Sequence, residues 1–190
     1  MPKGWGTKIG LARWTARLGT VLTLGLLTAA CFQPLYSRES APAGDSVRDK
    51  MAAVEVVNIP ARNGTPDARL AVSLRNALMF NLNNGAAPSL PTHRLQITLS
   101  SGVITVIVDV SSGRPDTQVE TLNATFTLTE IATKKVVLTT STFARASFDI
   151  PGSAQRFARQ RAGRDAEDRA VTLIADNIRN RLASFFVAGT

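Results

Sequence analysis

The sequence predicts an α+β protein in which a mostly antiparallel four-stranded sheet carries two helices on one face. Two segments, 66–83 and 154–186, space their apolar residues as helices do, and three segments between them alternate apolar and polar residues. Short turns separate those three strands, which predicts an antiparallel meander. With one strand before the first helix, the order is β-α-β-β-β-α, a two-layer sandwich.

The first strand and the first helix have clear ends in the sequence. The strand is expected at 52–60, AAVEVVNIP, which ends in a proline. Thr65 offers an N-cap hydroxyl, Pro66 suits the first helical position and Asp67 suits the first turn. Leucines then recur every fourth residue to about residue 83 and predict a buried stripe: Leu70, Leu74, Leu78 and Leu82. Asn84 and Gly85 predict a left-handed cap.

Three strands and a long helix complete the fold. The first of these strands is expected at 93–110, where a change of phase at Ser101 and Gly102 suggests a bulge or bend. A hairpin loop at 111–116, a strand to about 130, a turn at 132–135 and a strand at 136–148 follow. The last helix runs from Ala154 to about residue 186. At 1.5 Å per residue it is roughly 50 Å long.

Residues 1–30 have the organisation of an export signal. Four Lys or Arg residues and no acidic residue precede an apolar run at 20–30, and two alanines stand before Cys31. This run of eleven residues is shorter than the ~20 residues that a helix needs to span a bilayer. A basic region, a short apolar region and small residues at the cleavage point predict a signal peptide.

Cys31 is the predicted lipidation site. A cysteine directly after small residues is typical of bacterial lipoproteins, in which the thiol is acylated and the chain is cleaved just before it. The position three residues before the cysteine is usually Leu, Val or Ile, and here it is Thr28. Ordinary signal peptidase accepts the small residues Thr28 and Ala30 and would cut the same bond, so both readings predict export.

Cleavage before Cys31 would leave 160 residues. We expect a lipidated N-terminus and polar tether at 31–50 and a single domain at 51–190. The formal charge falls from +8 to +4 because the leader holds four cations. That charge is compatible with an anionic partner without requiring one, and we expect no nucleic acid. No second cysteine is present for a disulfide or zinc site, and we expect no cofactor.

The sequence carries no catalytic motif, which argues against an enzyme. The one histidine, His93, has no serine or aspartate at a motif spacing, and a lone histidine is most often structural. On the last helix, Asp165 and Arg169 have the favourable i,i+4 order, so its charged residues read as a salt-bridged, solvated face. Alanines at every fourth position, from Ala158 to Ala170, favour close packing on the protein's own sheet over a partner groove.

Cations recur in the turns between strands. Arg114 lies in one turn, and Lys134 and Lys135 lie in the next. Consecutive turns of a meander fall at opposite ends of their shared strand, which argues against one compact patch. Such cations commonly keep sheet edges soluble. The alternative is that they bind phosphate or carboxylate groups.

The start of the mature chain resembles the lipopolysaccharide-assembly lipoprotein family LptE, in its alphaproteobacterial form. The run at 31–36, Cys-Phe-Gln-Pro-Leu-Tyr, is similar to the family's Cys-Gly-Phe-x-Pro-Leu-Tyr start without its glycine. The run at 157–170 and the βαβββα order over 51–187 also look like this family.

The resemblance implies a non-enzymatic lipoprotein of the outer membrane. LptE proteins sit inside the β-barrel of LptD, help that barrel to assemble, and take part in inserting lipopolysaccharide into the outer leaflet. Phe32 follows the cysteine where an aspartate would signal inner-membrane retention. Arg114, Lys134 and Lys135 are the candidate lipopolysaccharide contacts, chosen from their charge and loop position. The alternative is a periplasm-facing lipoprotein subunit of another transport or secretion complex.

Overall fold

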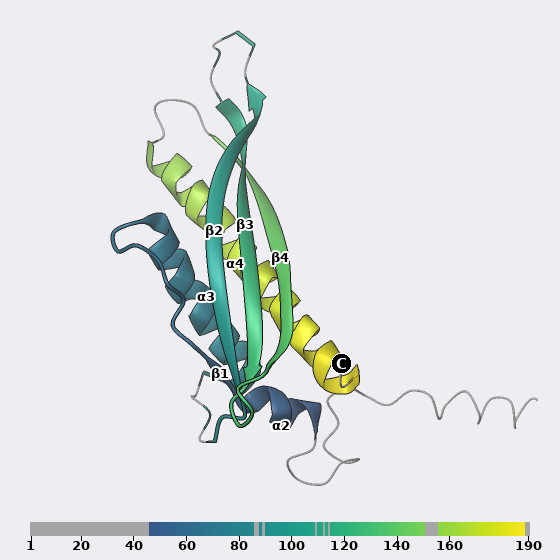
Figure 1. The fold of residues 1–190 in the computed structure, drawn as a ribbon. Coiled ribbons are helices and arrows are strands. Elements are labelled where there is room, and N and C mark those ends of the chain that lie inside the picture. The colour runs from purple at the N-terminus through teal and green to yellow at the C-terminus, as the bar shows by residue number, and fades with distance from the viewer. Residues whose placement is uncertain are drawn as a thin grey trace, which may run out of the picture. The chain divides into compact units, whose positions relative to one another are not determined.

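The computed structural model describes residues 46–85, 88, 90–108, 110–111, 113, 115–150 and 156–188. The predicted signal peptide, Cys31, most of the predicted tether and Arg114 therefore lie outside the described residues. Within them, one sheet and its helices follow the predicted order, with one additional short helix in front (Figure 1).

The sheet has four strands in the order β1-β2-β3-β4. They are β1 (Val54–Val56), β2 (His93–Val108), β3 (Pro115–Glu130) and β4 (Val136–Asp149). β1 pairs with β2 in parallel, and the other two pairings are antiparallel. The predicted mostly antiparallel sheet is confirmed. A parallel pairing of β1 with β2 is possible because α3 forms the crossover between them.

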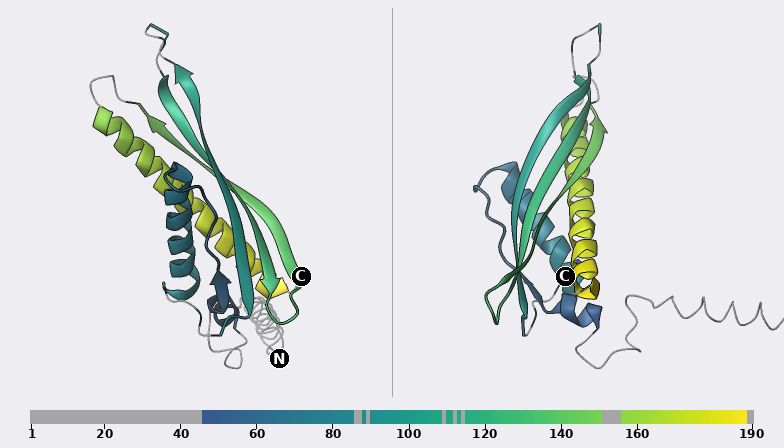
Figure 2. Two further views of the ribbon diagram at one scale, coloured as in Figure 1. Left: turned by 60° about the vertical axis from the view of Figure 1, so that its left-hand side comes forward. Right: turned by 45° about the vertical axis from the view of Figure 1, so that its right-hand side comes forward.

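Two long helices, α3 (Pro66–Asn83) and α4 (Arg156–Ala188), cover the same face of the sheet, as predicted (Figures 1 and 2). α3 ends at Asn84 with φ of 51°, the predicted left-handed cap, whose N–H donates to the Phe80 carbonyl. Its start differs in one detail. The Thr65 hydroxyl does not cap the helix and instead donates to the Arg62 carbonyl, at 2.6 Å.

A short helix that was not expected from the sequence precedes the first strand. A short helix, α2 (Val47–Ala52), occupies residues assigned to the tether and to the start of the first strand. Ser46 caps it, because its hydroxyl oxygen accepts a hydrogen bond from the Asp49 N–H at 3.2 Å. Met51 is buried and ties this turn of helix to the core. The first strand is correspondingly only three residues long.

The hydrophobic core lies between the inner face of the sheet and the helices. The leucine stripe of α3 is buried as predicted, and α4 contributes its alanines together with Ile174, Ile178 and Leu182. From the sheet come Leu95, Leu122, Phe126 and Leu128. Ala166 and Ala170 are fully buried, so the small residues bring α4 close to the protein's own strands, as the sequence favoured.

The sequence suggested a bulge or bend at Ser101 and Gly102, and there is no bulge at these two residues. Both residues pair in regular register with β3, and the register shifts occur further on, between Thr105 and Val108. The phase of the apolar pattern changes for another reason. The helices stop covering the inner face near Ser101, whose hydroxyl donates to Asp67 at the start of α3. Beyond that point the side chains of β2 are exposed on both of its faces, whereas Glu120 of β3, opposite Val103, is still buried.

Candidate functional site

Of the candidate cations in the turns, the structure describes Lys134 and Lys135. Lys134 and Lys135 are exposed in the β3–β4 turn, where Lys134 has a φ of 57°. The strand register places this turn beside His93 and Val54, at the end of the sheet that holds β1. The β2–β3 hairpin, whose loop contains Arg114, is at the opposite end. The described lysines therefore form no joint surface with that hairpin.

A stronger concentration of cations lies at the start of α4. All of its first four arginines are exposed: Arg156, Arg159, Arg161 and Arg164. Within the described part of the chain, none of them forms an ion pair. We call these four residues the arginine cluster.

The acidic residues near the arginine cluster have other partners. Asp165 accepts from Arg169 at 2.9 Å, as the i,i+4 spacing predicted, and Glu167 pairs with Arg69 of α3. The salt-bridged face expected from the sequence therefore begins only at Asp165. Arg161 and Arg164, which the sequence grouped with this face, are solvated as expected but form no described salt bridge, and no acidic residue lies between Arg156 and Arg164.

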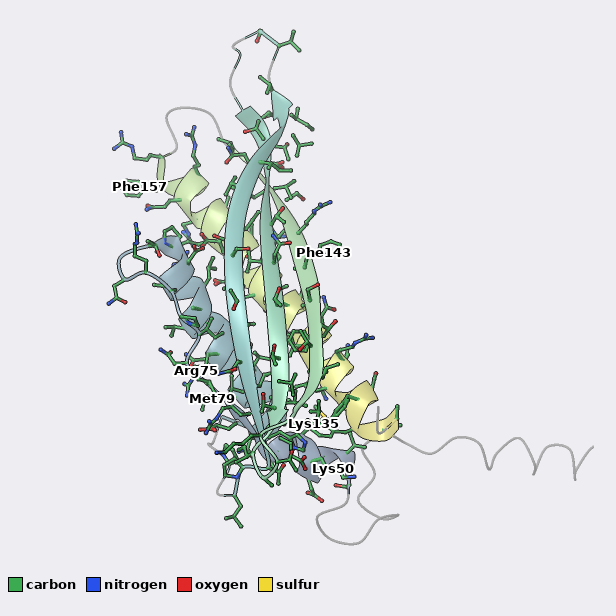
Figure 3. All side chains as sticks on the ribbon, viewed as in Figure 1. Lys50, Arg75, Met79, Lys135, Phe143 and Phe157 are labelled. Atoms are coloured by element: carbon green, nitrogen blue, oxygen red, sulfur yellow. The ribbon has the colours of Figure 1, made fainter. Side chains whose placement is uncertain are left out.

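The position of the arginine cluster is unfavourable for helix stability. The N-terminal end of a helix carries partial positive charge, so cations there weaken the helix rather than support it. An exposed aromatic side chain, Phe157, stands in the same turn and is 79% exposed (Figure 3). An apolar ring among unpaired arginines has no structural explanation in the described contacts, and it marks this end as a candidate binding surface.

The second notable surface is the end of β2. Its apolar side chains are roughly half exposed, from 48% for Val108 to 57% for Val106. We call the following set the apolar ribbon: Val103, Ile104, Val106, Ile107, Val108 and Val110. Val103 and Ile104 are successive residues of β2 and point to opposite faces, so the ribbon starts with an apolar side chain on each face; Val110, just beyond the strand, is fully exposed.

The arginine cluster and the apolar ribbon lie at the same end of the domain. Gly163 of α4 packs against the Phe148 ring of β4 at 3.8 Å, and Arg169 donates to the Ser147 carbonyl at 2.9 Å. The sheet register links Ser147 to Val119 of β3, and Val119 to Ile104 of β2. From this level, α4 and the β2–β3 hairpin both extend in the same direction (Figures 1 and 2).

A buried carboxyl group stands where the covered part of the sheet ends. Glu120 of β3 is only 4% exposed and pairs with Val103, the first residue of the ribbon. Burial first, and then the carboxylates of Glu167 and Asp67, raise the pKa of Glu120 to about 7, against the opposing effect of Arg69. Glu120 thus lies where α3, α4 and the sheet come together.

The remaining polar features do not form a reactive site. His93 packs edge-on against Phe186, with ring centroids 5.2 Å apart, and burial lowers its pKa against the opposing charge of Glu130. This is the structural role that the sequence favoured for it. Between β1 and α3 lies a cavity of about 100 Å³, bordered by Arg75 and Met79. No group of three or more His, Cys, Asp or Glu residues in the described ranges could hold a metal ion.

None of the described helices is long and apolar enough to cross a bilayer. A comparison with curated proteins gave no match. The fold, however, recurs among bacterial lipoproteins of known structure. A Caulobacter crescentus lipoprotein is 19% identical, with a TM-score of 0.57 over 74% of this chain and 96% of the other. The rare lipoprotein B of Shewanella oneidensis is 15% identical, with a TM-score of 0.51 over 71% and 96%.

These identities establish a shared fold and no more. The family assignment comes from the sequence itself. Residues 51–182 match the family described as "LptE: Lipopolysaccharide-assembly", which covers most of the described domain. The match begins after the cysteine-proximal motif and ends within α4, and the chain belongs to the LptE family of lipopolysaccharide-assembly proteins.

Proposed function

We propose that this protein is a non-enzymatic outer-membrane lipoprotein that plugs an LptD-like β-barrel, assists its assembly, and takes part in inserting lipopolysaccharide into the outer leaflet. Family membership supports the link to lipopolysaccharide assembly. The cysteine-proximal motif supports the alphaproteobacterial form, with Cys31 as the lipidated residue.

The arginine cluster is the observation on which lipopolysaccharide binding depends most. Lipopolysaccharide carries phosphates or acidic sugars, and guanidinium groups form charge-assisted, often paired hydrogen bonds with such anions. The four arginines are exposed and make no ion pair within the described ranges, so a ligand need not displace an internal partner. Arg114, Lys134 and Lys135 remain separate candidates for the same chemistry.

The polar outer face of the sheet supports the proposal that the partner is a β-barrel. No described helix covers this face, and its side chains are mostly uncharged and polar. It displays a hydroxyl- and amide-rich set: Gln96, Thr98, Ser100, Asn123, Thr125, Thr127, Thr139 and Ser141. Such side chains can hydrogen-bond the polar interior of a transmembrane barrel, although they suit water equally well.

The test is binding of purified lipopolysaccharide by the full-length protein in detergent. Changing Arg156, Arg159 and Arg161 together to glutamine should weaken binding strongly at low salt and less at high salt, because exposed charge pairs are screened. Gln is a good helix former, so α4 should persist. The matched control removes Arg114, Lys134 and Lys135. If only the control weakens binding, the turn cations are the ligand site and the arginine cluster is not.

The alternative is a periplasm-facing subunit of another transport or secretion complex. It predicts a protein that binds a small ligand and no large barrel. Co-purification separates the two proposals, because only the first predicts a β-barrel protein bound in equal amount.

A further inference from the structure

The apolar ribbon is the largest group of exposed branched side chains that the fold leaves unexplained. No charged residue and no proline occurs between Leu95 and Val108, and Asp109 is the one charged residue within the range of the ribbon. Protein sheets normally protect such an edge with Lys, Pro, a bulge or a covering element, and here the register shifts between Thr105 and Val108 are the irregularity present in the described pairing. β1 pairs with β2 only at 93–95, so the rest of that edge receives no strand among the described residues. An apolar occupant is needed to shield it.

The ribbon also differs from an ordinary core strand. A strand that packs on one layer of helices is apolar on its inner face and polar on its outer face, as β2 is from Gln96 to Ser100. From Val103 to Val108 every residue but Thr105 is apolar, so apolar side chains occur on both faces. The occupant must therefore surround the ribbon rather than cover one side. Flexible hydrocarbon chains do this more readily than a rigid folded surface.

The charges beside the ribbon decide between the possible occupants. A second copy of this chain would bring another arginine cluster to the same end, and the like charges would repel. An apolar peptide strand would cover the ribbon but would leave the arginines without anions. An anionic, acylated lipid satisfies both surfaces, because its chains are apolar and its head group carries acidic groups.

We propose that the apolar ribbon binds the acyl chains of an anionic lipid of the lipopolysaccharide class while the arginine cluster binds its acidic groups. This inference rests on the proposed function and assigns the hydrophobic part of the ligand to β2. Ile104, Val106 and Ile107 are its central contacts.

The experiment compares intact lipopolysaccharide with lipopolysaccharide from which alkali has removed the acyl chains. The test variant of the full-length protein carries Ile104→Thr, Val106→Thr and Ile107→Thr. Threonine is β-branched and preserves strand propensity while it removes apolar contact. The control carries Val72→Thr and Leu173→Thr, which alter apolar side chains of similar exposure on α3 and α4. Thermal melts establish that both variants fold.

The wild-type protein should bind the intact form more tightly than the deacylated form. The ribbon variant should bind the intact form about tenfold more weakly than wild type, since burial of apolar area no longer contributes fully. It should bind the deacylated form as wild type does. The arginine variant should lose affinity for both forms, and the helix control should lose neither.

Three outcomes would overturn the inference. One is equal binding of intact lipopolysaccharide by the ribbon variant and the wild type. Another is equal binding of both forms by the wild type, which would leave the proposed function standing without an acyl-chain site. The third is a ribbon variant that loses self-association in sedimentation while keeping lipid affinity, which would make the ribbon an interface between copies. If wild type binds neither form, the proposed lipopolysaccharide role itself fails.

Discussion

Glu120 is the only charged side chain that is buried within the described part of the chain. It faces the carboxylates of Asp67 and Glu167 across the junction of α3, α4 and β3, with Arg69 as the compensating cation. Because Arg69 already pairs with Glu167, its charge is shared. A buried carboxyl in this setting is stabilised in its neutral form.

The stability of the domain should consequently fall as the pH rises through the range set by Glu120. Its folded pKa of about 7 exceeds its ordinary value of 4.5. The folded state therefore holds the proton more tightly than the unfolded state, and this contribution is complete below pH 4.5 and lost by about pH 7. Glu120→Gln should remove this slope, worth on the order of 1–3 kcal/mol between pH 5 and pH 8.

Chemical denaturation of wild type and variant at several pH values measures this effect. Asp168→Asn, at an exposed position on α4, is the matched control and should keep the wild-type profile. Parallel profiles for wild type and Glu120→Gln would show that Glu120 is already ionised in the fold at low pH.

Individual residues also show where sequence reasoning works and where it does not. Asn84 was predictable as a left-handed cap because its conformation depends on local backbone chemistry. The hydrogen bond of the Thr65 hydroxyl was not predictable, because a threonine side chain can bond either to the helix N-terminus or to a preceding carbonyl, here that of Arg62. The sequence shows four arginines close together at the start of α4, but it does not show that they lack acidic partners. That depends on the folded structure, in which Glu167 pairs with Arg69 instead.

At the scale of elements, α3 offers a direct test of the packing. Leu74 is fully buried in the middle of the leucine stripe, between α4 and the sheet. Leu74→Ala removes buried methyl groups and leaves a cavity, and it should cost ~2–5 kcal/mol of unfolding free energy. The exposed neighbour Val72, changed to Ala, should cost far less. Equal melting temperatures for the two variants would mean that this face of α3 is not core.

In β2 the change in the apolar pattern was recognised correctly from the sequence, but its cause was not. The sequence pattern does change at Gly102, and a bulge is one cause of such a change. The structure has regular pairing there, and the real cause is the end of helix cover. Strand alternation reports which faces are buried, and burial is decided by elements distant in the sequence. The lengths of α3 and α4 relative to β2 were not available from β2 alone.

At the scale of the whole molecule, the element order was predictable because each element has its own periodicity and cap. The parallel pairing of β1 and the extra helix α2 were less accessible. β1 is three residues long, and α2 is six, so neither repeats its pattern often enough to be recognised in the sequence. That the two turns of β3 lie at opposite ends of that strand follows from meander topology and was predictable before the structure.

Membrane attachment is a property of the whole chain and should depend on one residue. We predict that Cys31→Ala releases the protein from membranes without unfolding it, since the substitution removes the thiol that would carry the lipid. Acyl chains contribute ~0.8 kcal/mol per buried CH₂, and stable anchoring needs more than one chain. Membrane fractionation with a thermal melt measures both effects. An intact mass of the wild type without added acyl groups would refute lipidation.

The central claim is that this domain works as the lipoprotein partner of an outer-membrane barrel in lipopolysaccharide assembly. The most direct measurement is affinity purification of the full-length protein from detergent-solubilised outer membrane, followed by quantification of the bound proteins and of lipopolysaccharide. The account predicts one large β-barrel protein in equal amount, together with lipopolysaccharide that the arginine variant loses while it keeps the barrel. Recovery of the wild-type protein with neither barrel nor lipopolysaccharide would contradict it.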